Sequence, residues 1–346
     1  MNEQAEEGDR LAGAPHPRER FDLVGHGEAE AAVFAAWEKG RLPHAILIGG
    51  PEGIGKATLA YRIARFVLAN PVAGAAAGGA TDLAVAPDHP ASRQVRALSH
   101  PDLLVLRRVK AEEAKKLPSE ISVDAVRRTV SFFGSTAALG GWRVCIIDSA
   151  EELNRNGANA LLKVLEEPPA RSLLLIVSHS PGRLLATVRS RCRRIVLRPL
   201  PAADVERALE SLAADMPDLP RERFREAAGA SGGSVRHALA LLGGDGLEVR
   251  NLTSGLLSHL PAVDGERLHA LCDRIQREQG LQVFAETVED WLAAAAGSNA
   301  PPARLARLAE TWEKVRRAAV EAEIYNLDRK PLVFQVFSML AEATRR

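Results

Sequence analysis

The sequence predicts a doubly wound α/β domain with a five-stranded parallel sheet, followed by helical domains. Five short apolar runs, rich in β-branched residues, occur in the first 200 residues. Gly, Pro or charged residues bound these runs, as is typical of buried parallel strands. Helix-spaced apolar patterns separate the runs, and this alternation favours a sheet with helices on both faces. After Pro201 the apolar patterns are those of helices.

The sheet domain is expected to span residues 1–200. Its strands are expected at 44–48, 103–106, 144–147, 173–177 and 195–197. Its helices are expected over 56–68, 122–133 and 154–167. The last helix ends before Pro168 because proline cannot continue a helix. Residues 70–93 are rich in Ala, Gly and Pro and lack a sustained period, which predicts a surface insertion.

Two helical domains are expected after the sheet. The first, over 201–245, has short helices expected over 203–214, 221–228 and 234–242. A glycine-rich break then leads to a second domain over 247–346, with longer helices expected over 266–278, 281–296, 302–322 and 331–344. Apolar side chains of the second domain, such as Trp291 and Phe334, predict either a core of its own or a surface for assembly with other subunits.

The composition excludes several classes of protein. With 346 residues, of which 46% are hydrophobic, the chain can bury a substantial core, which excludes simple disorder. A net charge of +1 excludes a whole-protein basic field for nucleic acid or an anionic membrane. The 3 cysteines lie far apart, which excludes a disulfide framework and indicates a reducing compartment. Because signal-peptide and membrane-span patterns are absent, we expect a cytoplasmic protein that does not enter a membrane.

The strongest chemical signal is the segment Gly50-Pro-Glu-Gly-Ile-Gly-Lys56, between a predicted strand and a predicted helix. Its glycines, Gly50, Gly53 and Gly55, allow backbone N–H groups to surround a phosphate, and Lys56 can reach the outer phosphates. A magnesium-binding Ser or Thr should follow the lysine, but Ala57 stands there. Thr58 comes one residue late, about 100° further round the helix. Two interpretations stay open: a degenerate nucleotide site with weak ATP or ADP binding, or only a tight connection between strand and helix.

A second signal is the predicted strand that ends at Asp148. In phosphate-loop proteins an acid at this place positions magnesium, and hydrolysing relatives follow it with a Glu that polarises the attacking water. Here Ser149 follows. An Asp after a strand is also often a helix cap. Together with Ala57, Ser149 predicts a phosphate-loop fold without ATP hydrolysis of its own.

The third signal is the triplet Ser190-Arg191-Cys192 before the last predicted strand. An arginine projecting from the domain can stabilise the charge that develops on a γ-phosphate bound by a neighbouring subunit. The alternative is that Arg191 belongs to a solvated basic edge with Arg189, Arg193 and Arg194.

Four segments carry a family resemblance. They occur in the order Pro43–Lys56, Asn159–Pro169, Ser190–Cys192 and Gly233–Leu239. Together they resemble the clamp-loader branch of the AAA+ ATPases, and most closely the delta-prime family of bacterial DNA polymerase III. Shorter matches extend the resemblance over nearly the whole chain.

The resemblance implies an α/β P-loop (AAA+) domain, a helical lid domain and an all-α collar domain. In the family the collar assembles a hetero-oligomeric ring with motor and delta subunits, and the ring loads a sliding clamp onto primed DNA. The chain is therefore expected to be an accessory subunit of a DNA-directed DNA polymerase, a nucleotidyltransferase, without catalysis by the isolated chain.

The resemblance also implies roles for single residues. Arg191 matches the arginine finger that acts in trans on a neighbour's ATP. Asp148, Ser178 and Arg236 match positions of the nucleotide site, Ser178 as the first sensor and Arg236 as the second. Many members hold zinc with four cysteines, but the matching interval here offers only His89 and His100, so no metal and no required cofactor are expected.

Two other functions are alternatives to this one. An active AAA+ motor subunit of the same loader is disfavoured by Ala57 and Ser149. A P-loop scaffold unrelated to replication is disfavoured because it would make the match from Asn159 to Cys192 a coincidence.

Overall fold

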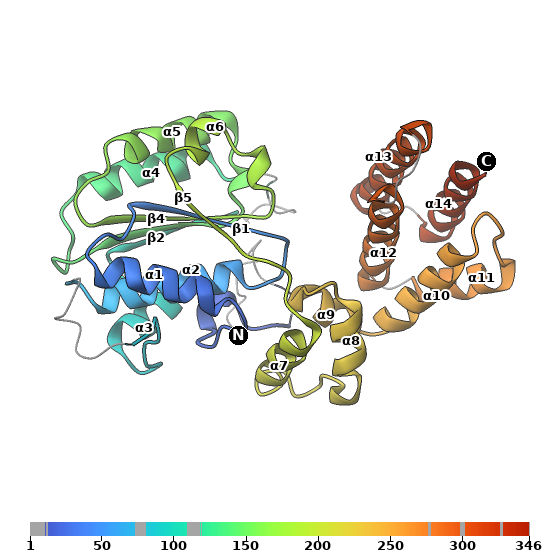
Figure 1. Ribbon diagram of the computed structural model, residues 1–346, viewed down its shortest axis with the longest axis horizontal. Helices are drawn as coiled ribbons and strands as arrows, with labels where there is room; N and C mark the ends of the chain where they lie inside the picture. The colour runs from blue at the N-terminus through green and yellow to red at the C-terminus, as the bar shows by residue number, and fades with distance from the viewer. Residues whose placement is uncertain are drawn as a thin grey trace. The chain divides into compact units, whose positions relative to one another are not determined.

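A five-stranded parallel sheet lies at the centre of the N-terminal part of the protein in the computed structural model (Figure 1). Its strands are β1 (Ala45–Gly49), β2 (Leu103–Leu106), β3 (Arg143–Ile147), β4 (Ser172–Ser178) and β5 (Arg193–Val196). Their order across the sheet is β2-β3-β4-β1-β5. The structure describes residues 11, 13–72, 81–108, 118, 120–275, 278–297, 302–325 and 328–345. The five predicted strands are confirmed.

Helices cover both faces of this sheet (Figure 1). One layer contains α1 (Gly27–Glu38), α2 (Lys56–Ala69) and α3 (Pro90–Arg96), and the other contains α4 (Val123–Gly134), α5 (Arg155–Glu166) and α6 (Ala186–Arg189). Along β1 the side chains alternate, so that Ile46 and Ile48 pack in the first layer while Ala45 and Leu47 pack in the second. The strands are therefore buried on both faces, which explains their continuous apolar sequence.

The predicted helices of the sheet domain begin at side-chain caps or at the phosphate loop. The Ser122 hydroxyl accepts a hydrogen bond from the N–H of Ala125 (3.2 Å) at the start of α4. Asn154 Oδ1 accepts one from the N–H of Gly157 (2.8 Å) at the start of α5. These caps satisfy N–H groups that have no partner within the helix. Helix α1, which the sequence patterns did not predict, begins after His26 without a side-chain cap.

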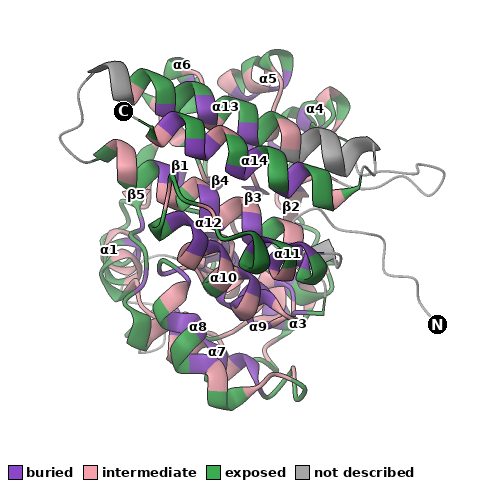
Figure 2. Cartoon of the chain, turned by 90° about the vertical axis from the view of Figure 1, so that its right-hand side faces the viewer, coloured by how far each residue is buried: buried purple, intermediate pink, exposed green. Residues whose placement is uncertain are grey.

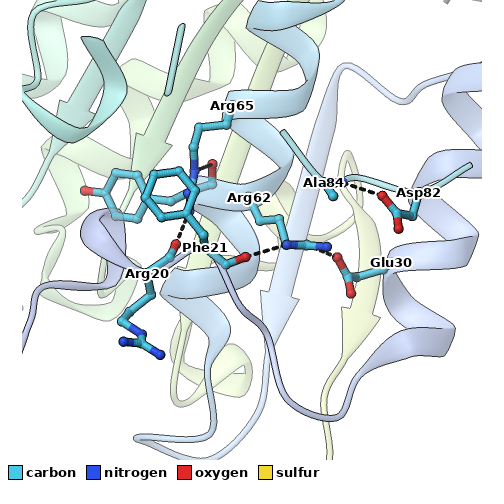
Figure 3. A network of polar contacts seen from close by, with 8 residues as sticks. Arg20, Phe21, Glu30, Arg62, Arg65, Asp82 and Ala84 are labelled. Atoms are coloured by element: carbon cyan, nitrogen blue, oxygen red, sulfur yellow. Dashed lines mark hydrogen bonds and ion pairs between the residues drawn. The ribbon is translucent and has the colours of Figure 1, made fainter. Parts of the chain in front are cut away.

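The segment before α1 is held against α2 (Figure 3). Arg62 donates to the Glu30 carboxylate and to the Phe21 carbonyl. Arg65 donates to the Arg20 carbonyl, and its guanidinium lies 4.3 Å from the centroid of the Phe21 ring. Burial lowers the pKa of Arg65 to about 10, with a smaller contribution from Arg62. Two arginines of α2 thus fix the chain that leads into α1.

The expectation that residues 70–93 form a surface insertion is wrong in part. Leu83 is 1% exposed and packs in the core layer of α1 to α3. Residues 90–93 begin α3, whose N-terminus is capped by His89. Leu83 and Val85 both pack against this core, but two apolar anchors in a stretch of small residues leave no sustained period, which explains the difference. Residues 73–80 lie outside the described residues.

The chain divides into two compact units. The first comprises residues 1–218 and 232–236, and the second comprises 219–231 and 237–346. Helix α7 (Ala202–Leu212) lies in the first unit and α8 (Phe224–Ala230) in the second, while the boundary falls within α9 (Val235–Leu242). The expected domain over 201–245 is thus divided between the units, and the three-domain boundaries stay a prediction.

The second unit continues with five helices among its described residues. These are α10 (Gly246–Ser258), α11 (Gly265–Arg274), α12 (Glu278–Gly297), α13 (Pro302–Tyr325) and α14 (Arg329–Thr344). Figure 2 shows buried and exposed residues alternating along α13 and α14. Leu292, Val315 and Phe337 are buried in this unit, whereas Phe334 is 38% exposed. Most of its large apolar side chains therefore fill its own core.

Helix α10 was not predicted, because it starts within the glycine-rich break at residues 243–246. Over the part of the chain that the structure describes, no helix combines the length and apolar character needed to cross a membrane.

Candidate functional site

The phosphate loop, residues 50–55, connects β1 to α2 at the carboxyl edge of the sheet. Gly50 has a φ of 145° and Gly53 a φ of 74°, values that favour glycine. A Cβ on Gly50 would lie 2.5 Å from the Leu197 carbonyl oxygen. Helix α2 begins at Lys56 after Gly55, without a side-chain cap. The predicted loop geometry, in which a helix N-terminus follows a strand, is therefore confirmed, and such a terminus favours anions.

The loop is bonded to the start of α9. The Gly53 carbonyl accepts hydrogen bonds from the N–H groups of Val235 (3.0 Å) and Arg236 (3.4 Å). A Cβ on Gly53 would overlap the side chains of Ser234 and Arg236. The Arg236 Nε atom lies 3.2 Å from the Glu52 Oε1 atom. Arg236, the expected second-sensor residue, is thus brought to the loop, where it pairs with the Glu52 carboxylate.

Lys56 is buried, at 3% exposure, and its ammonium donates to the carbonyl of Pro51 within the loop. Burial lowers the pKa of Lys56 to about 8, and the carboxylates of Glu52, Asp148 and Glu151 offset this effect only in part. The amine that should contact outer phosphates is therefore bonded to its own loop and loses its proton more readily than an ordinary lysine.

The acidic strand end lies beside Lys56. Asp148 follows β3 and is 5% exposed, and Ser149 adopts a left-handed conformation with a φ of 56°. The Ser149 Oγ atom lies 3.1 Å from His179 Nε2, and the His179 N–H donates to Glu151 Oε1 (2.7 Å). The Glu151 carboxylate is therefore engaged, and Ser149 supplies a hydroxyl where hydrolysing proteins have a carboxylate base.

Ser178 and His179 complete this edge. Ser178 is fully buried at the end of β4, and its hydroxyl accepts a hydrogen bond from the Ser180 N–H (3.2 Å). Burial and the nearby Lys56 charge lower the pKa of His179, against the carboxylates of Glu151 and Glu52. The structure thus places charged or polar groups from the phosphate loop, the start of α2, the ends of β3 and β4, and the start of α9 at one edge.

Sequence reasoning found most of this edge but not all of it. Thr58 lies half-buried on the first turn of α2. The sequence patterns did not identify three further members of this edge, Glu52, Glu151 and His179. Their positions are nevertheless readable signals, since Glu52 lies inside the loop, Glu151 follows Asp148 and His179 follows Ser178. Their partners could be identified only once the strand ends were brought together.

Arg191 lies apart from these groups, between α6 and β5. Its side chain is 36% exposed, and its Nη2 atom lies 2.8 Å from Glu166 Oε1. Nη1 donates to the Thr187 carbonyl (2.9 Å). By contrast, Arg189 donates to the carbonyls of Pro181 and Gly182, so it has a structural role and does not belong to a uniformly solvated edge.

The two histidines considered for zinc have other contacts. His89 Nδ1 accepts the N–H of Ala91 (3.2 Å), and His100 Nδ1 accepts the N–H of Asp102 (3.1 Å). Burial lowers the pKa of His100, against the opposing charge of Asp102. Both rings serve as local backbone caps, and the absence of zinc stays a prediction.

Comparisons with known proteins decide the family. The sequence model described as "DNA polymerase III, delta subunit" matches residues 26–201. The DNA polymerase III subunit delta' of Escherichia coli is 32% identical over 262 residues, which cover 75% of this chain and 73% of that protein. The chain belongs to the delta-prime family of DNA polymerase III. Its five-stranded parallel sheet, the loop between β1 and α2 and the helices that follow fit the α/β P-loop fold expected of this family.

Other family members and relatives match over different lengths. The delta-prime protein of Pseudomonas aeruginosa is 44% identical over 200 residues, which cover 58% of this chain but only 56% of that relative. The DNA polymerase III subunit tau of E. coli is 28% identical over 281 residues, which cover 80% of this chain and 41% of tau. Delta-prime and tau sequences are therefore both recognisable relatives of this chain.

Proposed function

We propose that this chain is the non-hydrolysing delta-prime subunit of a clamp loader and that it supplies Arg191 to the ATP site of a neighbouring subunit. It is proposed to assemble with motor and delta subunits in a hetero-oligomeric ring that loads a sliding clamp onto primed DNA in the cytoplasm. Family membership supports the assembly, since the relatives are named as subunits of DNA polymerase III.

The observation that carries the non-hydrolysing role is the internally bonded phosphate loop. Lys56 donates to Pro51, and the Gly53 carbonyl accepts from the start of α9. Ala57 offers no oxygen to magnesium, and Ser149 cannot serve as the base for water. These residues fit a magnesium nucleotide poorly, so we propose that ATP or ADP binds weakly and that neither a nucleotide nor zinc is required.

The trans role of Arg191 is supported by its exposure and by its chemistry. A guanidinium stays charged and offers two N–H groups to phosphate oxygens in a planar fork. Fingers of this kind increase hydrolysis by about 10³-fold to 10⁵-fold. Cys192, next to Arg191, turns inward and packs in the layer of α4 to α6, which anchors the backbone at the finger.

ATP turnover tests the proposal. The isolated chain should show no turnover above background, whereas a loader reconstituted with motor subunits, delta, clamp and primed DNA should hydrolyse ATP. The Arg191→Ala variant should assemble normally and lose about 10³-fold or more of the rate at the one site it serves. Arg191→Lys should rescue poorly because an ammonium lacks the fork.

Arg194→Ala is the matched control, because Arg194 is an exposed arginine on the neighbouring strand β5. Turnover by the isolated chain that is lost in Lys56→Ala would contradict the non-hydrolysing role. An assembled Arg191→Ala loader with every phase of hydrolysis unchanged would contradict the trans role.

A further inference from the structure

The backbone that carries Arg191 is fixed on its inner side. Val188 of α6 is 4% exposed and packs with α4 and α5, and the Cys192 thiol lies 3.2 Å from the Val188 carbonyl oxygen. Burial raises the pKa of the Cys192 thiol to about 11, so this anchor stays uncharged at neutral pH. Arg191 therefore starts from a defined position beside the C-terminal end of α5, the helix that contacts α6.

The guanidinium of Arg191 is folded back onto its own chain. Nη2 lies 2.8 Å from Oε1 of Glu166, the last residue of α5, while Nη1 donates to the Thr187 carbonyl (2.9 Å) and lies 3.5 Å from Ser190 Oγ. Both terminal nitrogens of the fork are engaged. The Arg191 guanidinium could bind a phosphate in a neighbouring subunit only after it releases these contacts.

We propose that Glu166 is a positioning residue that holds Arg191 on its own chain and is displaced when the guanidinium enters a neighbour's ATP site. This inference rests on the proposed function of Arg191. The Glu166 carboxylate competes with phosphate oxygens for the same Nη2 atom. Left beside the finger, its negative charge would also repel the γ-phosphate.

The exposure of the pair suits a reversible contact. Glu166 is 49% exposed and Arg191 36% exposed, so water screens their attraction. An exposed ion pair of this kind shifts an equilibrium by no more than about five-fold. A triphosphate carries several charges and can therefore displace one screened carboxylate.

The test uses the whole chain in the reconstituted loader. Glu166→Gln removes the charge while keeping the shape, and Glu167→Gln is the matched control on the next residue, which is exposed and forms no ion pair within the described part of the chain. Single-turnover ATP hydrolysis is measured, and the phase that disappears in Arg191→Ala defines the site served by the finger.

In Glu166→Gln this phase should become about two- to five-fold faster, with the KM for ATP unchanged because ATP is bound by the neighbour. Glu167→Gln should match the wild type. The Glu166→Gln/Arg191→Ala double variant should match Arg191→Ala, because Glu166 acts only through Arg191. Glu166→Ala provides a second variant should Gln fail to assemble, and it should also accelerate the phase.

The outcomes separate the two hypotheses. If Arg191→Ala leaves every phase unchanged, the proposed function of Arg191 is wrong. If Arg191→Ala removes a phase that both Glu166 variants leave unchanged or slow, the finger role stands and the restraining role of Glu166 is overturned.

Discussion

At the scale of a single residue, the burial of Lys56 is the feature of the phosphate loop that most affects the free energy of unfolding. It is 3% exposed, and burial lowers its pKa to about 8 from the ordinary 10.5. Between these two values the unfolded chain binds more protons at this residue than the folded chain does. The free energy of unfolding therefore gains a contribution from Lys56 as the pH rises from about 8 to 10.5, and below pH 8 the charged amine has its full destabilising effect.

Lys56→Met should therefore stabilise the protein at pH 7, by on the order of 1–3 kcal/mol, since it removes the buried charge. The difference in the free energy of unfolding between Lys56→Met and the wild type should decrease as the pH rises from 8 to 10.5. Urea unfolding at several pH values would measure it. Lys163→Met, at an exposed position on α5, is the control and should show no such pH dependence. A constant difference at all pH values would mean that packing, and not the charge, decides the effect.

At the scale of elements, the contact between the phosphate loop and α9 depends on Gly53. Gly53→Ala should place a methyl group against Ser234 and Arg236 and hold alanine at a φ of 74°. We expect a loss of about 2 kcal/mol or more in the free energy of unfolding, together with faster amide exchange at Val235.

Gly182→Ala is the control for this substitution, because a Cβ there meets no atom within 4 Å and the φ is not positive. It should change stability by less than about 0.5 kcal/mol. If the two substitutions changed the free energy of unfolding equally, the structure would relieve the overlap at Gly53 without any loss of stability.

The elements also show what the sequence could predict. The strands and helices α2, α4 and α5 were predictable because their apolar periodicity and their stops, such as Pro168, are local. Helix α1 follows His26, which is not a favoured N-cap residue, and α10 starts within the glycine-rich break, so neither start stood out in the sequence. The loop residues were recognisable as a motif, but the bonds of Gly53 to Val235 and Arg236 join segments far apart in the chain. The pairing of Glu166 with Arg191 likewise needed the packing of α5 against α6.

At the scale of the whole molecule, two compact units with separate cores should unfold in two steps. Phe133 of α4 is 1% exposed in the first unit, and Phe337 of α14 is 1% exposed in the second, where its ring centroid lies 6.1 Å from that of Phe284. Either Phe→Ala substitution should cost about 3–5 kcal/mol. Calorimetry should show Phe133→Ala lowering one transition temperature and Phe337→Ala lowering the other.

The two variants serve as controls for each other, because they remove the same side chain from different cores. A single transition that both variants shift equally would mean that the units unfold as one cooperative body.

The position of β1 in the sheet has a consequence for synthesis. β1 pairs with β4 on one side and β5 on the other, and Ala45 lies opposite Leu174. During translation at about 5–20 residues per second, the roughly 130 residues that separate these partners take about 6–26 s to make. For that time a strand whose five residues all become buried has neither neighbour. The nascent chain must therefore keep this apolar strand from aggregating until β4 emerges, and we expect synthesis of this protein to depend on a holding chaperone at the ribosome.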